Sequence, residues 1–231
     1  MHLISLENVS KSYKNGVHAL RDVNLYIEEG EFVYIIGPTG SGKSTLIKLL
    51  DGELIPDSGS VHVAGCDVGK LRHSKVPLYR RNIGVIFQDY QLLPEMTVFE
   101  NIAFALQVIN MDKVAIRRRV REVLELVSLA DKAKSFPREL SGGQQQRATI
   151  GRAIANKPKV LIADEPTGNL DPEKSQEIMQ LLEKINQEQK TTILMVTHDS
   201  TLVDSNKKRT IALEEGFVVA DIQKGGYLHH D

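Results

Sequence analysis

The sequence contains a single cysteine, Cys66, so it cannot form an internal disulfide, and we expect the chain to fold in a reducing compartment. It also lacks an apolar run of the roughly 18–20 residues that would span a bilayer. Its net charge of −1 provides no overall basic surface of the kind that binds nucleic acid. Without repeats or low-complexity stretches, the 231 residues predict one globular domain, or one domain in two lobes, with no nucleic-acid partner and membrane contact only through a partner protein.

Near-continuous apolar stretches alternate with segments of helical spacing. The predicted strands are 20–27, 32–36, 60–64, 83–87, 160–163, 192–196, 211–213 and 217–219. After the fourth of these strands the pattern becomes helical, at 99–109 and among the valines of 114–127, so residues 89–155 are predicted to form an inserted helical lobe. Residues 1–88 and 156–231 then form an α/β core, with a mostly parallel sheet covered on both faces.

A complete phosphate-binding loop (P-loop) pattern stands between a predicted strand and a predicted helix. It consists of Gly37, Pro38, Thr39, Gly40, Ser41, Gly42, Lys43 and Ser44, followed by Thr45 as a further predicted nucleotide-binding residue. The glycines let the backbone wrap around phosphates, and the helix adds its positive dipole end. Lys43 can bridge the β- and γ-phosphates, and the Ser44 hydroxyl can ligate Mg²⁺. A glycine-rich turn without chemistry is the alternative, but the flanking strand and helix favour a site for ATP and Mg²⁺.

Two carboxylates end a buried strand later in the chain, at Asp164 and Glu165. Asp164 is placed to hold Mg²⁺ through water, as the strand-end aspartate of P-loop NTPases does. Glu165 is then the candidate base that orients or deprotonates the attacking water. The alternative is an exposed acidic turn before Pro166, which would not need the apolar run that precedes it.

Three further residues join this candidate site through their positions in the sheet. Gln88 and His198 also follow strands, and residues at the carboxyl ends of parallel strands share one edge of a sheet. The Gln88 amide can touch both Mg²⁺ and the hydrolytic water, and His198 can hydrogen-bond the γ-phosphate. Tyr13 can stack on adenine through its ring face. Each also has a simpler interpretation: polar surface for Gln88, a structural histidine for His198, and a half-buried strand aromatic for Tyr13.

Leu140 to Gln144 is a second candidate phosphate-binding segment, about a hundred residues after the first. Ser141 can cap a helix, and Gly142 and Gly143 let backbone N–H groups approach an anion closely. Two such helix starts far apart in sequence suggest that ATP is held between two bodies. A further helix is predicted to start at Asp171, with Pro172 at its first position.

These motifs together resemble the ATP-binding-cassette ATPases, the nucleotide-binding subunits of ABC transporters, over nearly the whole chain. In the family's terms the motifs are Walker A at 37–44, the Q-loop at Gln88, the LSGGQ sequence at 140–144, Walker B at 160–164 and the D-loop at 169–171, with Tyr13 as the adenine-stacking aromatic. The resemblance makes Glu165 the catalytic carboxylate, His198 the switch histidine, and Gln88 the third catalytic residue. It implies a P-loop NTPase fold with a RecA-like core, an antiparallel β subdomain and the inserted helical lobe.

The resemblance also implies a homodimer that forms head to tail when ATP binds. Each ATP would lie between Walker A of one copy and Ser141, Gly142, Gly143 and Gln144 of the other, and Asp171 joins the ATP-binding residues. Hydrolysis would then replace the ATP contacts that join the two copies with charge repulsion, so that the copies separate. Opening and closing would move a membrane partner docked near Gln88 and the helical lobe.

Short stretches point to one branch of the family. Residues 164–171 resemble lipoprotein-release ATPases, macrolide-type exporters and the bacterial cell-division ATPase, and residues 84–94 and 134–140 resemble the division type. Residues 49–54 depart from the exporters' pattern. The resemblance implies a polytopic partner of the FtsX type, regulation of septal peptidoglycan hydrolysis, and a peripheral location on the cytoplasmic face of the membrane at the septum. An ATPase of an exporter or lipoprotein-release system remains the alternative.

Other nucleotide-binding classes fit less well. A DNA-repair or ribosome-associated cassette protein needs long coiled-coil insertions or two cassettes, and this chain has neither. A binding clamp without turnover would lack the base, but Glu165 is present. A guanine-reading motif would need Asp where Lys159 stands, and a small-molecule kinase would not explain residues 140–144.

One basic cluster is left unassigned by these motifs. It contains Arg117, Arg118, Arg119 and Arg121. A solvated helix face is one interpretation. The other is a surface that meets acidic lipid headgroups or a partner loop.

Overall fold

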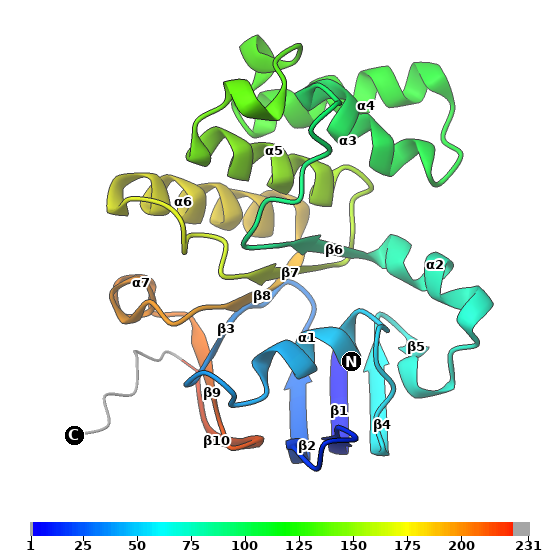
Figure 1. Ribbon diagram of the computed structural model, residues 1–231, viewed down its shortest axis with the longest axis vertical. Helices are drawn as coiled ribbons and strands as arrows, with labels where there is room; N and C mark the ends of the chain where they lie inside the picture. The colour runs from blue at the N-terminus through cyan, green and yellow to red at the C-terminus, as the bar shows by residue number, and fades with distance from the viewer. Residues whose placement is uncertain (1, 224–231) are drawn as a thin grey trace.

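A computed structural model describes residues 2–223 and contains two β-sheets that pack against helix α1 (Lys43–Leu50) (Figure 1). The larger sheet has the order β10 (Phe217–Ile222), β9 (Arg209–Glu214), β3 (Phe32–Ile36), β8 (Thr192–Val196), β7 (Val160–Asp164) and β6 (Ile83–Ile86). Its strands pair in parallel except for β10, which forms an antiparallel hairpin with β9. The smaller, antiparallel sheet has the order β2 (His18–Ile27), β1 (Ile4–Ser12), β4 (Ser58–Val63) and β5 (Cys66–Asp67).

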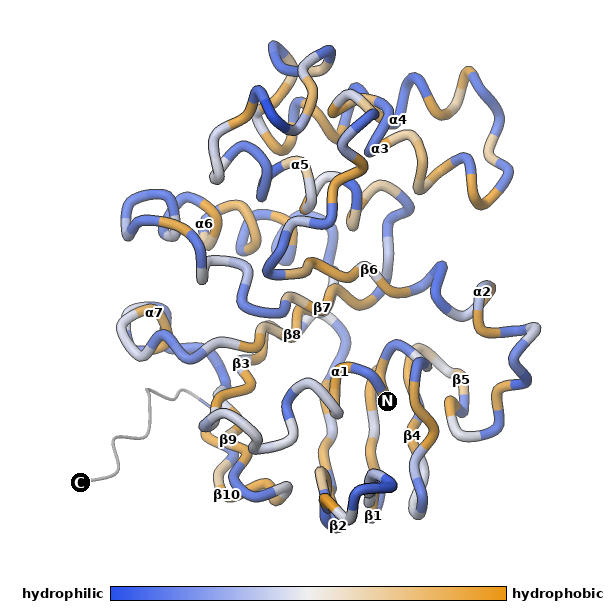
Figure 2. Tube along the Cα trace, viewed as in Figure 1, coloured by the Kyte–Doolittle hydropathy of each residue, from blue (hydrophilic) through white to orange (hydrophobic). Residues whose placement is uncertain are grey.

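The central strands of the larger sheet bury both of their faces. Along β3, Phe32, Tyr34 and Ile36 enter the core beneath the helices, whereas Val33 and Ile35 enter the core shared with the smaller sheet. Strands β7 and β8 alternate between the same two cores. Two buried faces explain why these stretches are continuously apolar, and Figure 2 shows the hydrophobic colour along them. The predicted α/β fold with a mostly parallel sheet and an antiparallel sheet is confirmed.

The helices form a second layer and an outer lobe. They are α2 (Val76–Tyr79), α3 (Val98–Gln107), α4 (Lys113–Leu126), α5 (Gly142–Ile154), α6 (Pro172–Gln189) and α7 (Ser200–Asn206), with short 3₁₀ turns at 68–70, 73–75, 80–82, 130–132 and 137–139. Helices α3, α4 and α5 lie between β6 and β7 in sequence and stack on the far side of the larger sheet from α1 (Figure 1). Across residues 2–223, no helix combines the length and apolar character needed to cross a membrane.

Local signals set several of the element boundaries. Asp171 caps α6 by accepting a hydrogen bond from the Lys174 N–H, and Pro172 is the first helical residue, as the sequence predicts. A capping box between Thr97 and Glu100 starts α3 one residue before the predicted helix. The predicted strand 60–64 ends at Val63, because Ala64 turns the chain with a φ of 51°.

Truncation of Leu50 should test the core that joins the two sheets. Leu50 lies on α1 and is 0% exposed, so Leu50→Ala leaves a cavity and should lower the free energy of unfolding by about 2–5 kcal/mol in urea titrations. Ile55→Ala is the control, because Ile55 is 54% exposed and should change stability by less than about 0.5 kcal/mol. Equal losses in the two variants would contradict the placement of this core.

Candidate active site

The P-loop connects β3 to α1 through a backbone that is fixed from both sheets. A Cβ on Gly37 would lie 2.0 Å from the carbonyl oxygen of Leu213 in β9, and one on Gly42 would lie 2.3 Å from that of Ala19 in β2. Both positions therefore require glycine, and both have positive φ. Gly40 also has a positive φ of 83°, but a Cβ there would meet nothing within 4 Å. The loop thus presents bare backbone to open space, where an anion can approach it.

Lys43 folds its ammonium back over this loop. Its Nζ donates hydrogen bonds to the carbonyl oxygens of Gly37 at 2.7 Å and Pro38 at 2.8 Å. Burial lowers the pKa of Lys43, while the nearby carboxylates of Glu165 and Asp164 oppose that change. A partly desolvated ammonium gains more than a solvated one from an anionic phosphate, so Lys43 is poised to exchange its carbonyl partners for phosphate oxygens.

A cavity of ≈ 390 Å³ opens beside the loop. It is lined by Tyr13, Val17, Ala19, Thr39, Gly40, Gly42, Lys43, Ser44, Thr45, Gln88, Asp164, Glu165 and Val196. Segments far apart in sequence therefore meet at the carboxyl ends of the strands. The Tyr13 hydroxyl lies 3.1 Å from Thr45 Oγ1, which ties the predicted adenine-stacking aromatic to the first turn of α1. Sequence reasoning missed Val17, Ala19 and Val196, since apolar residues carry no motif.

Three oxygen-bearing side chains in this cavity suit a hard divalent cation. They are the Ser44 hydroxyl, the Gln88 amide and the Asp164 carboxylate, all of which line the same space. Burial raises the pKa of Asp164, the adjacent Glu165 raises it further, and Lys43 opposes the rise. Within residues 2–223, no group of three or more His, Cys, Asp or Glu side chains could hold a metal. The hydroxyl, amide and carboxylate oxygens of this set would suit Mg²⁺, with water and phosphate oxygens as its remaining ligands.

Glu165 and His198 form a close pair next to this cavity. His198 Nδ1 lies 2.7 Å from Glu165 Oε1, and the side chain of Glu165 is only 14% exposed whereas that of His198 is 70% exposed. Glu165 has a positive φ of 48°, which is strained for a residue other than glycine, and its N–H donates to the Val196 carbonyl. The structure thus places a largely buried carboxylate in contact with an exposed imidazole.

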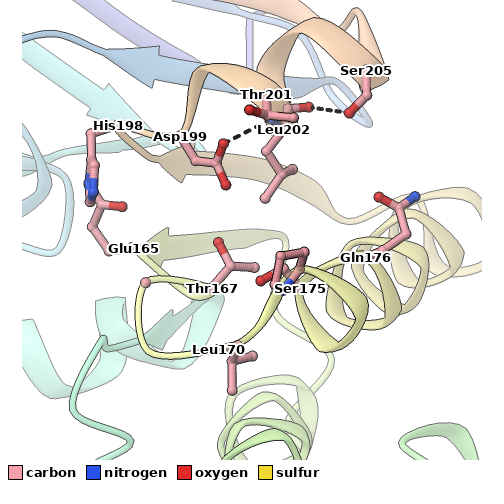
Figure 3. Close-up of a pocket in the computed structure, with 12 residues that line it drawn as sticks. Glu165, Thr167, Leu170, Ser175, Gln176, His198, Asp199, Thr201, Leu202 and Ser205 are labelled. Atoms are coloured by element: carbon pink, nitrogen blue, oxygen red, sulfur yellow. Dashed lines mark hydrogen bonds and ion pairs between the residues drawn. The ribbon is translucent and has the colours of Figure 1, made fainter.

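Glu165 and His198 also line a second cavity, of ≈ 360 Å³ (Figure 3). Its lining includes Glu165, Thr167, Gly168, Leu170, Ser175, His198, Asp199 and Thr201. Asp199 caps α7 by accepting a hydrogen bond from the Leu202 N–H. Glu165 therefore lines both cavities.

The 140–144 segment lies outside both cavities. Ser141 caps α5, where its Oγ accepts a hydrogen bond from the Gln144 N–H and the Gln144 Oε1 accepts one from the Ser141 N–H. Ser141 is exposed to solvent. Asp171 also lies apart: it caps α6, and its ion pair with Lys174 lowers its pKa. One chain therefore assembles the P-loop, Gln88, Asp164 and Glu165, but leaves these other predicted ATP-binding residues elsewhere.

Tyr90 links the Q-loop to the start of α5, a connection that the sequence did not reveal. Its carbonyl oxygen accepts hydrogen bonds from Thr149 Oγ1 at 3.0 Å and from Arg152 Nη2 at 3.1 Å. A Cβ on Gly142 would lie 3.0 Å from the Tyr90 hydroxyl oxygen. Tyr90 has a positive φ of 56°, so tertiary contacts hold this segment in a conformation that its own sequence does not favour.

Three comparisons with known proteins agree with this geometry. A family profile described as ABC transporter matches residues 20–168. The chain is 56% identical to the cell division ATP-binding protein FtsE of Streptococcus pneumoniae over all 231 residues of both chains, and 49% identical to FtsE of Bacillus subtilis over 99% of this chain and 100% of that one. A dimeric post-hydrolysis structure of the ATP-binding cassette MJ0796, bound to ADP and Pi, aligns with a TM-score of 0.85 and 38% identity over 97% of this chain and 100% of that chain.

The ionised side chain of Asp164 should lower the free energy of unfolding of the nucleotide-free protein. Because its pKa is raised in the fold, ionisation at about pH 7 disfavours the folded state, and Asp164→Asn should raise the melting temperature in calorimetry. The gain should disappear below about pH 4, the ordinary aspartate pKa, where the carboxyl is protonated in both states. Asp131→Asn, at a carboxylate 74% exposed, is the control. A gain that persists in acid would argue against the ionisation as its cause.

Proposed function

The chain belongs to the ABC transporter family and is an ATPase, and from that premise we propose that two copies enclose two ATP molecules and drive a membrane partner during cell division. One observation carries the proposal: the cavity beside the P-loop gathers Gln88, Asp164 and Glu165, while Ser141 lies outside it. A cavity that holds the P-loop, Gln88, Asp164 and Glu165 but lacks the signature segment is what half of a shared site would look like.

The second half is proposed to come from another copy of the chain. Ser141 stands exposed at the N-terminus of the 13-residue α5, where the helix dipole and a hydroxyl favour an anion. The side-chain Oε1 of Gln144 accepts the Ser141 N–H in the capping box, so Gln144 is proposed to shape this helix start. The dimeric form of the related MJ0796 cassette supports the same arrangement for this chain.

We propose the following roles for residues around the triphosphate. Lys43 and the P-loop N–H groups bind the phosphates, and Tyr13 stacks on the adenine. Ser44, Gln88 and Asp164 would hold Mg²⁺, which neutralises phosphate charge when bound. Glu165 accepts a proton from the attacking water, since it is a largely buried carboxylate that lines the cavity and contacts His198. His198 orients that carboxylate through its Nδ1 contact and contacts the γ-phosphate.

The same contacts suggest how the site passes its state to the helical lobe. The Asn169 side chain donates to the Gln88 carbonyl oxygen, and Tyr90 is held by Thr149 and Arg152 of α5. In this proposal a displacement of Gln88 acts on α5 through the side chains of Thr149 and Arg152, which donate to the Tyr90 carbonyl oxygen. We propose that the lobe moves a polytopic partner of the FtsX type and so regulates septal peptidoglycan hydrolysis, from a peripheral position at the cytoplasmic face of the septal membrane. The FtsE relatives support this assignment.

Glu165→Gln tests the catalytic assignment. The amide keeps the size of the side chain but cannot accept a proton, so the ATPase rate should fall by about 10²–10⁴-fold while ATP binding by calorimetry is retained. Glu188→Gln on the exposed side of α6 should leave the rate unchanged. A rate near normal for Glu165→Gln would remove Glu165 from this role.

The slow variant also tests the shared site. With ATP and Mg²⁺, Glu165→Gln should sediment as a dimer, because hydrolysis no longer separates the copies. Adding Ser141→Arg should leave ATP bound to the monomer and abolish the dimer, since the new side chain occupies the phosphate-facing position. A normal ATP-dependent dimer in that double variant would contradict the head-to-tail arrangement.

Depletion in the cells that encode this chain tests the biological role. Loss of the chain should produce filaments or failed septa, and re-expression of Glu165→Gln should not restore division although the protein binds ATP. Affinity purification of the wild type from membranes should recover a polytopic partner with an extracellular domain. Normal septa together with a lost export or lipoprotein-release phenotype would assign the chain to the alternative role.

A further inference from the structure

Helix α4 carries four cations on a face that no described element covers. Its buried stripe, which packs against the rest of the lobe, is Ile116, Val120, Val123 and Leu124. Its exposed side chains in the first two and a half turns are Lys113, Val114, Arg117, Arg118 and Arg121, and we call this set the α4 basic face. Across residues 2–223, none of its four cations forms an ion pair with a carboxylate.

Arg119 shows what a structural arginine on the same helix looks like. Its Nε and Nη2 donate hydrogen bonds to the carbonyl oxygens of Ala155 and Ile154, and these hydrogen bonds cap the C-terminal end of α5. Its Nη1 forms an ion pair with Glu122. Its side chain is only 12% exposed. Among residues 2–223 the cations of the α4 basic face make no comparable contacts, so the packing of the lobe does not account for their charges.

The order of charges along α4 is the reverse of what helix stability favours. A helix is stabilised by acidic residues near its N-terminus and by basic ones near its C-terminus. In α4 the first turn carries the cation Lys113, and the last turn carries the carboxylate Glu125. Only Asp112, the N-cap, has the sign that the dipole prefers at that end. An order of charges that destabilises a helix is expected where those residues serve another purpose, such as binding a ligand.

Exposed apolar side chains accompany these cations. Val114, within the α4 basic face, is 75% exposed, and Val108, at the C-cap of α3 just before α4, is 61% exposed. A groove of ≈ 280 Å³ lies between α4 and the end of α5, and its lining includes Arg118, Glu122 and Lys157. Cations beside exposed valines match an amphipathic surface that lies on anionic headgroups with its apolar side chains at the acyl boundary.

We propose that the α4 basic face binds an anionic phospholipid surface directly, in addition to the contact made through a membrane partner. The charge is local: the chain as a whole carries −1, so the rest of the molecule is net negative and is repelled by such a surface. The four cations spread over successive turns without a convergent hydrogen-bonding pocket, which suits many headgroups better than one phosphate. This contact revises the expectation that the membrane is reached only through a partner, and it orients α4 toward the bilayer.

Co-sedimentation with vesicles tests this contact on the full chain without nucleotide. The probes are phosphatidylcholine vesicles with and without a minor fraction of phosphatidylglycerol. The wild type should bind only the anionic vesicles, and high salt should release it. Arg117→Gln/Arg121→Gln should reduce partitioning into anionic vesicles roughly 10- to 30-fold, because each cation near the surface contributes a factor of about five. Val114→Gln, which keeps the charge, should also weaken binding.

The matched control removes two exposed cations elsewhere, as Arg72→Gln/Lys184→Gln, and should bind as the wild type does. Circular dichroism and the ATPase rate should be normal for both double variants, because neither alters the nucleotide site. Absence of wild-type binding, or equal loss in the two double variants, would overturn the proposal. Wild-type binding to polyglutamate but not to anionic vesicles would also overturn it, in favour of an acidic protein segment. These outcomes are independent of ATP hydrolysis, so they are distinguishable from failure of the Glu165 or dimer assignments.

Discussion

The close approach of the P-loop backbone to strands of both sheets is the constraint on which the site depends. Gly37 lies against Leu213 of the larger sheet and Gly42 against Ala19 of the smaller one, at distances that admit no side chain. The turn after β9 adds hydrogen bonds, since the Gly216 N–H donates to the Ser41 carbonyl and the Arg21 N–H to that of Gly216. The phosphate cradle is therefore held by the junction of the two sheets, and its N–H groups are oriented before any ligand arrives.

The charged groups around this cradle are not arranged for stability. Burial lowers the pKa of Lys43 and raises that of Asp164, so each group is disfavoured in the ionised form that phosphate and metal chemistry requires. Glu165 adds backbone strain and a second carboxylate next to Asp164. Such local costs are typical of functional sites, because binding a triphosphate and a cation supplies the compensating charges.

Contacts beyond the cavity explain how a small site can act on a whole lobe. Tyr90 is the connection: its carbonyl is bound by α5, and its hydroxyl lies against Gly142 at the start of the same helix. In the mechanism we propose, Gln88 senses the ligand and α5 responds through this connection. Helix α4 packs on α3 and α5, so a basic face on α4 would let the responding lobe also contact a lipid surface.

Much of the fold and of the nucleotide site follows from local sequence signals. A strand, a glycine-rich loop and a helix predict the cradle at 37–44, and the Asp171–Pro172 cap predicts the start of α6, because these signals act within a few residues. Tertiary structure alone decided that Leu213 and Ala19 close on the loop, that His198 bonds Glu165, and that Ser141 stays outside the cavity. Those contacts join residues far apart in the chain, and no local propensity specifies them. They depend on how two sheets and a helical lobe pack, which only the complete fold defines.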